Sequence, residues 1–126
     1  MANANFAAIG TAFTTHYYQT FDSQRVNLQS LYQQESLLTF EGEQHAGMQA
    51  IMTKLTTLNF QTVAHKVTTC DSQPSPGGGI FVMVTGDLAV DGNTTTPLKF
   101  AQSFHLMPTQ SGSWYIHNDM FRLNYC

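Results

Sequence analysis

Charged side chains are scarce in this sequence of 126 residues, of which 10% are Asp, Glu, Lys or Arg. Only five residues are Lys or Arg, and they are scattered along the chain. A surface that binds nucleic acid needs clustered cations to neutralise phosphates, so we expect no nucleic-acid partner. The formal net charge of −3 is a mild acidic balance that many soluble proteins share.

Cysteines and long apolar runs are also few. The two cysteines, Cys70 and Cys126, show neither the spacing of a metal site nor a disulfide framework, which favours a reducing, intracellular compartment. No apolar run reaches the length of a membrane span, and the first ten residues lack the features of a secretory signal. We expect one soluble domain over residues 1–126, without cofactor, metal or membrane insertion.

Apolar residues in the first third recur at spacings of three and four from Phe6 to Phe21, which predicts a helix. Asp22 and Ser23 are good N-cap residues for a second, short helix over 26–32. We expect a first strand at 36–41, a short hairpin arm at 43–46 and a third helix over about 48–58.

The second half changes to strand-like patterns at 60–71, 80–90, 97–107 and 114–125, separated by loops that are rich in Gly, Pro, Thr or Ser. Residues 80–90 are nearly all apolar, as in a strand that is covered on both faces. The order predicts an α+β domain with a run of antiparallel strands and the helices on one face. If the sheet is strongly bent, its concave side forms a cup, with lining candidates Phe40, Leu58, Phe60, Met83, Met120 and Phe121. The alternative is that these residues are ordinary core.

The stretch "LLTFEGEQHAG" (37–47) places an acid directly after a large aromatic, at the end of a predicted strand. Glu41 and Asp91 both fall where strands end. An aromatic pocket ringed by acids suits a protein partner that presents an apolar side chain flanked by Lys or Arg. The alternative for both acids is a solvated turn. His65 is either a hydrogen-bonded structural residue or a residue that orients Glu41.

An enzyme would need a desolvated carboxylate or histidine that reaches a substrate proton inside the cup. Asp119 sits among apolar strand residues and either faces the cup or turns away to pair with Arg122. No nucleophile elbow, phosphate loop or metal-ligand spacing is present, so an enzyme is not favoured. The remaining candidates for acid–base or hydroxyl chemistry are His65, His105, His117, Tyr17 and Tyr32.

Six segments then carry a resemblance: "HYYQTFDSQR", "YQQESLLTFEG", "LNFQTVAHKVTTCDSQPSP", "VTGDLAVD", "FAQSFHLMP" and "NDMFRLNY". Together, and in this order from about residue 6 to residue 125, they resemble the nuclear transport factor 2 family. The resemblance implies a cone-shaped, cystatin-like superfold. It also implies a homodimer, joined through the sheet faces, that performs no chemistry. Such carriers bind GDP-bound Ran and phenylalanine–glycine nucleoporins and take Ran into the nucleus. They are found in cytoplasm and nucleus and concentrate at the nuclear pore.

The resemblance also implies residue roles. It assigns Ran binding to Phe40, Glu41, Leu58, Phe60, His65, Met83, Asp91, Asn93 and Phe121. It places Phe6 in nucleoporin binding and Met120 at the dimer interface. There are departures from the family pattern: Asn93 stands near a position where relatives carry a second acid, and Phe6 and Phe40 stand where some carry tryptophan.

Two rival functions stay open on the sequence. One is an enzyme of the same superfold, similar to ketosteroid isomerases or dehydratases, because fold does not determine function. The other is a subunit that heterodimerises with an mRNA export factor. The presence of both Glu41 and Asp91 argues against that second rival.

Overall fold

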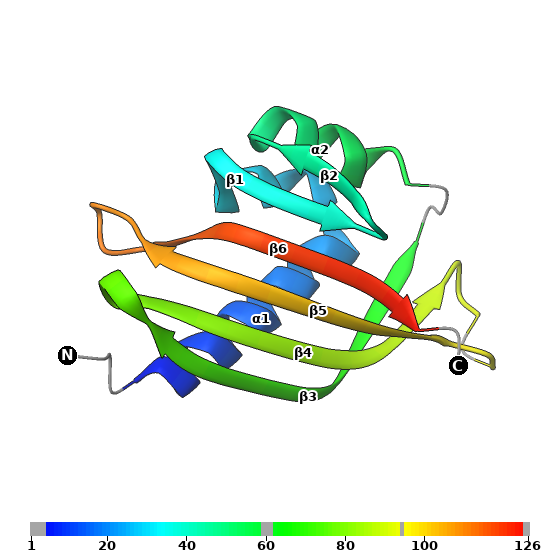
Figure 1. The fold of residues 1–126 in the computed structure, drawn as a ribbon. Helices are drawn as coiled ribbons and strands as arrows, with labels where there is room; N and C mark the ends of the chain where they lie inside the picture. The colour runs from blue at the N-terminus through cyan, green and yellow to red at the C-terminus, as the bar shows by residue number, and fades with distance from the viewer. Residues whose placement is uncertain (1–4, 59–61, 94, 125–126) are drawn as a thin grey trace.

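The computed structural model describes residues 5–58, 62–93 and 95–124. The described chain consists of α-helices, 3-10 helices and strands, and the strands form one sheet (Figure 1). The α-helices are α1 (Phe6–Ser23) and α2 (Met48–Thr56), and the 3-10 helices are η1 (Arg25–Leu31) and η2 (Pro76–Gly78). The strands are β1 (Tyr32–Phe40), β2 (Glu43–Ala46), β3 (Val63–Ser75), β4 (Gly79–Val90), β5 (Leu98–Pro108) and β6 (Trp114–Asn124). The predicted α+β class is confirmed.

The six strands form one sheet in the order β2-β1-β6-β5-β4-β3. Figure 1 shows the long strands curving around α1, which crosses one face of the sheet, while α2 lies beside β1 and β2. Four of the pairings are antiparallel, but β1 and β6 run parallel. The predicted run of antiparallel strands is confirmed from β3 to β6, whereas the parallel pairing of β1 with β6 was not predicted. Periodicity reports which face of a strand is buried, and it does not report the neighbour of that strand or its direction.

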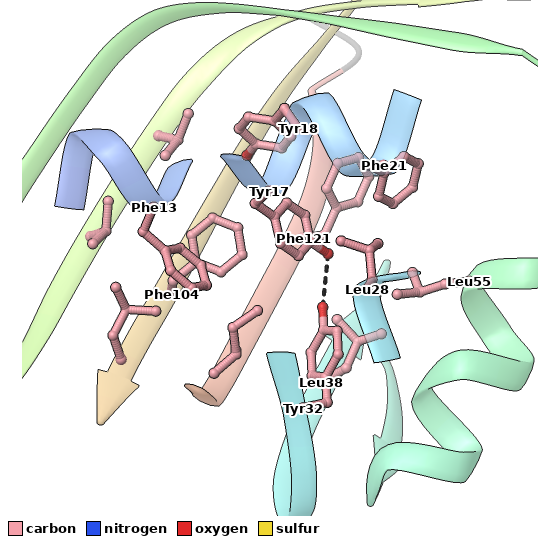
Figure 2. Close-up of a cluster of buried hydrophobic side chains, with 14 of the residues drawn as sticks. Phe13, Tyr17, Tyr18, Phe21, Leu28, Tyr32, Leu38, Leu55, Phe104 and Phe121 are labelled. Atoms are coloured by element: carbon pink, nitrogen blue, oxygen red, sulfur yellow. Dashed lines mark hydrogen bonds between the residues drawn. The ribbon is translucent and has the colours of Figure 1, made fainter. Parts of the chain in front are cut away.

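The core lies between α1 and the inner face of the sheet and is rich in aromatic side chains (Figure 2). Tyr17 of α1 lies 4.8 Å from Phe104 of β5, measured between ring centroids, and Phe13 meets the same ring edge-on at 5.9 Å. Tyr17 and Phe104 are essentially inaccessible to solvent. Large aromatic rings bury much apolar area for each residue, so this cluster fixes α1 across the sheet.

Several element boundaries differ from the predictions. Asp22 and Ser23 lie inside α1, and η1 begins at Arg25 without a side-chain cap, so the predicted capping of a second helix is wrong. Tyr32 begins β1 and does not belong to the helix before it. The predicted loop at 73–79 begins late, because β3 continues to Ser75. Pro74 is tolerated there because β3 is an edge strand, where a missing N–H need not break the ladder.

Strand β4 is covered on one face only within this chain. Ile80, Val82 and Val84 are buried, whereas Phe81 and Met83 are 52% and 53% exposed. The prediction that residues 80–90 are covered on both faces is therefore wrong for the single chain. We call the side of the sheet that carries Phe81, Met83 and Met120 the outer face, and the opposite side, which faces α1, the inner face.

Candidate functional site

A cavity of about 500 Å³ opens between the inner face of the sheet, α1 and α2. Most of its lining is apolar and comes from β1, α2, β4, β5 and β6, far apart in the sequence. Its apolar lining includes Leu38, Phe40, Leu55, Leu58, Leu88, Leu98 and Phe121. This volume is within the range of sites that take a small molecule or a single large side chain.

Three of the predicted cup residues line the cavity: Phe40, Leu58 and Phe121. The rings of Phe40 and Phe121 are stacked at 4.8 Å between centroids, with planes 10° apart. The stack exists because the parallel pairing sets Phe40 of β1 opposite Phe121 of β6. It forms an aromatic wall of the cavity, which the spacing of residues in the sequence did not predict. Phe60, another of the predicted cup residues, lies outside the described residues.

Met83 and Met120 do not line the cavity, and their prediction as cup residues is wrong. Met83 lies between the buried residues Val82 and Val84, so strand alternation turns it to the outer face. Met120 lies between the buried residues Asp119 and Phe121 and is 56% exposed. Both methionines project from the side of the sheet that is opposite to the cavity.

The two predicted rim acids occupy equivalent turns. Glu41 directly follows β1 and Asp91 directly follows β4, and each has a left-handed backbone with φ of 51°. A glycine with positive φ follows each acid, Gly42 and Gly92. Two successive residues with positive φ are typical of tight hairpin turns. Gly42 therefore lets the chain reverse immediately after Phe40, which leaves Glu41 at the tip beside the cavity wall.

Both rim carboxylates are anchored to the backbone of a neighbouring segment. The carboxylate of Glu41 accepts a hydrogen bond from the N–H of Leu123, which itself lines the cavity, at 2.5 Å. Asp91 Oδ1 accepts one from the N–H of Thr62 at 3.0 Å. These bonds hold the two negative charges in defined positions. They therefore reduce the side-chain conformational entropy that is lost when a partner binds.

Asn93 and Phe6 have more local surroundings. The Asn93 side chain bonds within its own turn, donating to Thr96 Oγ1 at 3.0 Å and accepting from the Thr96 N–H at 3.3 Å. It is exposed and acts as a turn residue. Phe6 is the first residue of α1 and is partly buried against the core, so only part of its ring is open to a partner.

His65 lines the cavity, but it does not orient Glu41 as one hypothesis held. Its partner is Asp22, at the end of α1: Nδ1 lies 2.6 Å from Asp22 Oδ1, and the His65 N–H donates to Oδ2 at 2.9 Å. The imidazole also stacks on Tyr18 at 4.3 Å between centroids. His65 thus ties the end of α1 to β3. Asp22 was missed because its predicted role was to cap a helix.

Asp119 points to the interior and not toward Arg122, because alternation along β6 places the two on opposite faces. Its carboxylate accepts hydrogen bonds from Tyr32 Oη at 2.7 Å and from Gln102 Nε2 at 2.8 Å. Tyr32 Oη lies 2.7 Å from Tyr17 Oη, the bond drawn in Figure 2, and Tyr18 Oη donates to Gln102 Oε1 at 2.7 Å. Burial raises the pKa of Asp119 from 3.8 to about 6, against the lowering effect of its two donors.

This network brings together three enzyme candidates, Asp119, Tyr17 and Tyr32, and leaves out the three histidines. His105 and His117 lie on the outer face, where His105 stacks on Phe81 at 4.3 Å between centroids. Tyr17 and Gln102 line the cavity, while Asp119 is buried behind them with both oxygens bonded within the protein. The arrangement holds the floor of the cavity rigid and directs no carboxylate oxygen at a guest.

The raised pKa of Asp119 predicts a pH-dependent contribution to stability. Below pH 3.8 the carboxyl is neutral in both the folded and unfolded states, so its charge costs nothing there. Between about pH 4 and pH 6 the carboxyl ionises in the unfolded state but stays protonated in the folded state, which favours unfolding. Stability from this group is therefore lost over this window, on the order of 3 kcal/mol.

Urea unfolding of the wild-type protein and of Asp119→Asn across pH 4–8 checks this expectation. Asn cannot titrate, so the variant's free energy of unfolding should rise relative to wild type between about pH 4 and 6 and level off above. A change in hydrogen bonding alone would shift the two curves by a constant. Parallel curves would show that Asp119 does not titrate in this range.

Among the described residues, no group of three His, Cys, Asp or Glu side chains is placed to hold a metal ion. Within the same ranges, neither α-helix is both long and apolar enough to cross a membrane.

Comparison with known proteins agrees with this geometry. The family described as Nuclear transport factor 2 (NTF2) domain matches residues 9–123. Nuclear transport factor 2B of Arabidopsis thaliana is 53% identical over 119 residues, which cover 94% of both chains. Nuclear transport factor 2 of Saccharomyces cerevisiae is 48% identical over 122 residues, which cover 96% of both chains. The solved structure of nuclear transport factor 2 from Cryptosporidium parvum superposes with a TM-score of 0.92, at 48% identity and 97% coverage of each chain.

A more distant likeness concerns the fold alone. A putative scytalone dehydratase from Novosphingobium aromaticivorans superposes with a TM-score of 0.77 at 12% identity, covering 93% of this chain and 83% of the dehydratase chain. The superfold thus includes proteins named as enzymes, but the near-full-length relatives described above are named as transport factors. This agrees with the expectation that the chain is not an enzyme. The chain belongs to the nuclear transport factor 2 family.

Proposed function

We propose that this protein is a nucleocytoplasmic transport carrier that binds GDP-bound Ran and takes it into the nucleus. The observation that carries the proposal is the cavity with its stacked wall of Phe40 and Phe121 and an anchored acid, Glu41, at the end of that wall. An aromatic side chain of Ran would enter the cavity, and basic residues flanking it would pair with the rim acids. The protein would then work in both cytoplasm and nucleus and concentrate at the nuclear pore.

The cavity supplies most of the affinity in this proposal. A buried aromatic side chain removes about 150 Å² or more from water, which is worth on the order of 4 kcal/mol before the costs of association. Leu58 and Phe121 extend the apolar contact. Phe60 is expected to add to this contact. Met83 is not expected to contact the Ran side chain, because it lies on the outer face.

The rim supplies orientation and partner choice. Glu41 and Asp91 are held by backbone N–H groups, so their charges are in place before Ran arrives. His65 contributes indirectly by holding the end of α1 against the cavity wall. Asn93 provides no charge, so the turn after β4 offers one acid where some relatives offer two or more. The ion pair that is lost would contribute under about 1 kcal/mol at an exposed position.

We propose that two copies of the chain form a homodimer through their outer faces. Phe81, Met83 and Met120 are each more than half exposed and project from the same face of the sheet, the first two from β4 and the third from β6, with β5 between these strands. Charges of both signs, such as Asp71 opposite Met83 and Arg122 on β6, share this face. In a two-fold arrangement the same patch meets itself, so an acid of one copy can meet a base of the other.

We also propose that phenylalanine–glycine repeats of nucleoporins bind beside Phe6. The open part of its ring, at the start of α1, offers a stacking surface for a phenylalanine side chain. This site is on a different part of the chain from the rim acids, so a carrier could hold Ran and the pore together.

Calorimetric titration against Ran tests the central proposal. The protein should bind Ran loaded with GDP and show at least about 100-fold weaker binding to Ran loaded with a non-hydrolysable GTP analogue, because the γ-phosphate reorders the switch loops. Equal binding to both forms would contradict the carrier proposal. Binding to neither form would favour the rival functions, and a co-purifying export factor would then identify the heterodimer.

A further inference from the structure

The cavity has one feature that the Ran proposal does not use, which is the ammonium group of Lys54. Lys54 lies in the last turn of α2 and lines the cavity. Its Nζ lies 5.3 Å from the centroid of the Phe40 ring, over that ring. Since Phe121 stacks on Phe40 at 4.8 Å, the cation occupies the side of the ring left open by the stack.

Lys54 is also the one permanently charged side chain among the described residues that line the cavity. Several polar groups of the lining are already engaged within the protein. Tyr17 Oη bonds with Tyr32, the Gln102 amide bonds with Asp119 and Tyr18, and Thr57 Oγ1 donates to the carbonyl of Thr53. His65 also lines the cavity, and its Nδ1 is paired with Asp22. A guest that carries a negative charge therefore finds its cationic partner at Lys54.

The present partner of Lys54 is easily replaced. Its Nζ lies 3.2 Å from Glu43 Oε1, and the Glu43 side chain is 67% exposed, against 28% for Lys54. An ion pair with an exposed carboxylate contributes little free energy, because water solvates that carboxylate almost as well as the lysine does. A carboxylate that approaches from the cavity side would meet Lys54 next to apolar surface, where a charged hydrogen bond is stronger.

We infer that the cavity is a binding site for small apolar carboxylic acids. The carboxylate would take Lys54 Nζ from Glu43, and the hydrocarbon or aromatic body would lie against Phe40, Leu55 and Leu88. The cavity of about 500 Å³ accommodates a body of this size. Glu41 and Asp91 lie at the rim, each hydrogen-bonded to a backbone N–H, whereas Lys54 lines the cavity, so the guest carboxylate is expected beside Lys54 and away from the rim acids. This inference goes beyond Ran binding, because it needs no protein partner.

Calorimetry with octanoate, and with octanamide as an uncharged control of the same shape, tests the inference. Octanoate should bind with a dissociation constant below about 1 mM, and octanamide at least about tenfold more weakly. Lys54→Met should weaken octanoate binding at least about tenfold and leave octanamide unchanged. The methyl NMR signals of Leu55 and Leu88 should shift when octanoate is added.

Lys99→Met is the matched control variant. Lys99 is also paired with an acid, since its Nζ lies 3.4 Å from Asp87 Oδ1, but it does not line the cavity. It should bind octanoate as wild type does. The inference is overturned if octanoate fails to bind, if Lys54→Met leaves its affinity unchanged, or if the shifts fall on Met83 and Met120 instead. No Ran is present in this assay, so its failure would leave the carrier proposal standing.

Discussion

Replacing Glu41 with lysine is expected to abolish measurable binding of GDP-bound Ran, with a loss of at least about 100-fold in affinity. The lysine would set a positive charge where the proposal places a basic residue of Ran. Like charges that meet in an interface cost several kcal/mol, which exceeds the loss of a single exposed ion pair. The left-handed turn at Glu41 and Gly42 keeps the new side chain at the end of the aromatic wall. Calorimetric titration measures the loss directly.

Two variants separate the charge of Glu41 from its structural role. Glu41→Gln keeps an oxygen that can accept the Leu123 N–H and removes only the charge, so it should fold normally and bind Ran more weakly than wild type. Glu35→Lys makes the same charge change at an exposed position of β1 and should bind like wild type. If Glu41→Lys melts with the wild-type profile and still binds GDP-bound Ran, the rim is not the Ran site.

Replacing Met120 with glutamate is expected to convert the dimer to a monomer at micromolar concentration. In the dimer this side chain would be buried between two sheets, where an unpaired carboxylate costs several kcal/mol. In the isolated chain Met120 is 56% exposed, so the folded monomer should tolerate the change. The dissociation constant of the dimer should rise at least about 100-fold. Light scattering coupled to gel filtration would report a mass of one chain instead of two.

Val26→Glu is the control for this experiment. Val26 is 61% exposed and lies on η1, away from the outer face, so its replacement adds the same charge to an apolar surface position without touching the proposed interface. It should remain dimeric. A wild-type protein that is already monomeric at micromolar concentration, or a Met120→Glu variant that stays dimeric, would refute the outer face as the interface.

Local patterns determined the parts of the structure that depend on neighbouring residues in the chain. The spacing from Phe6 to Phe21 was sufficient for α1, because a helix needs one apolar side at each turn. The acid–glycine pairs at 41–42 and 91–92 marked two tight turns, because positive φ is easily adopted by glycine. The six matching segments were sufficient to identify the family. The family in turn predicted the superfold and the likeness to a carrier.

Only the tertiary structure decided which way the residues of an apolar strand point. Phe81, Met83 and their neighbours form a run in which both faces are apolar, so alternation carries no sign of which face is inner. The error at Met83 follows from this ambiguity. The parallel pairing of β1 with β6, and the Phe40–Phe121 stack that it creates, likewise depend on chain segments about 80 residues apart.

The polar contacts of the site also belong to the tertiary structure. Asp22 meets His65 across 43 residues, and Tyr32 meets Asp119 across 87. Lys54 reaches the Phe40 ring only because α2 packs beside β1. Sequence could identify which of these residues are able to donate, accept or carry charge, since that is chemistry of single side chains. Their partners were decided by packing, because each bond joins elements that meet only when the sheet closes around α1.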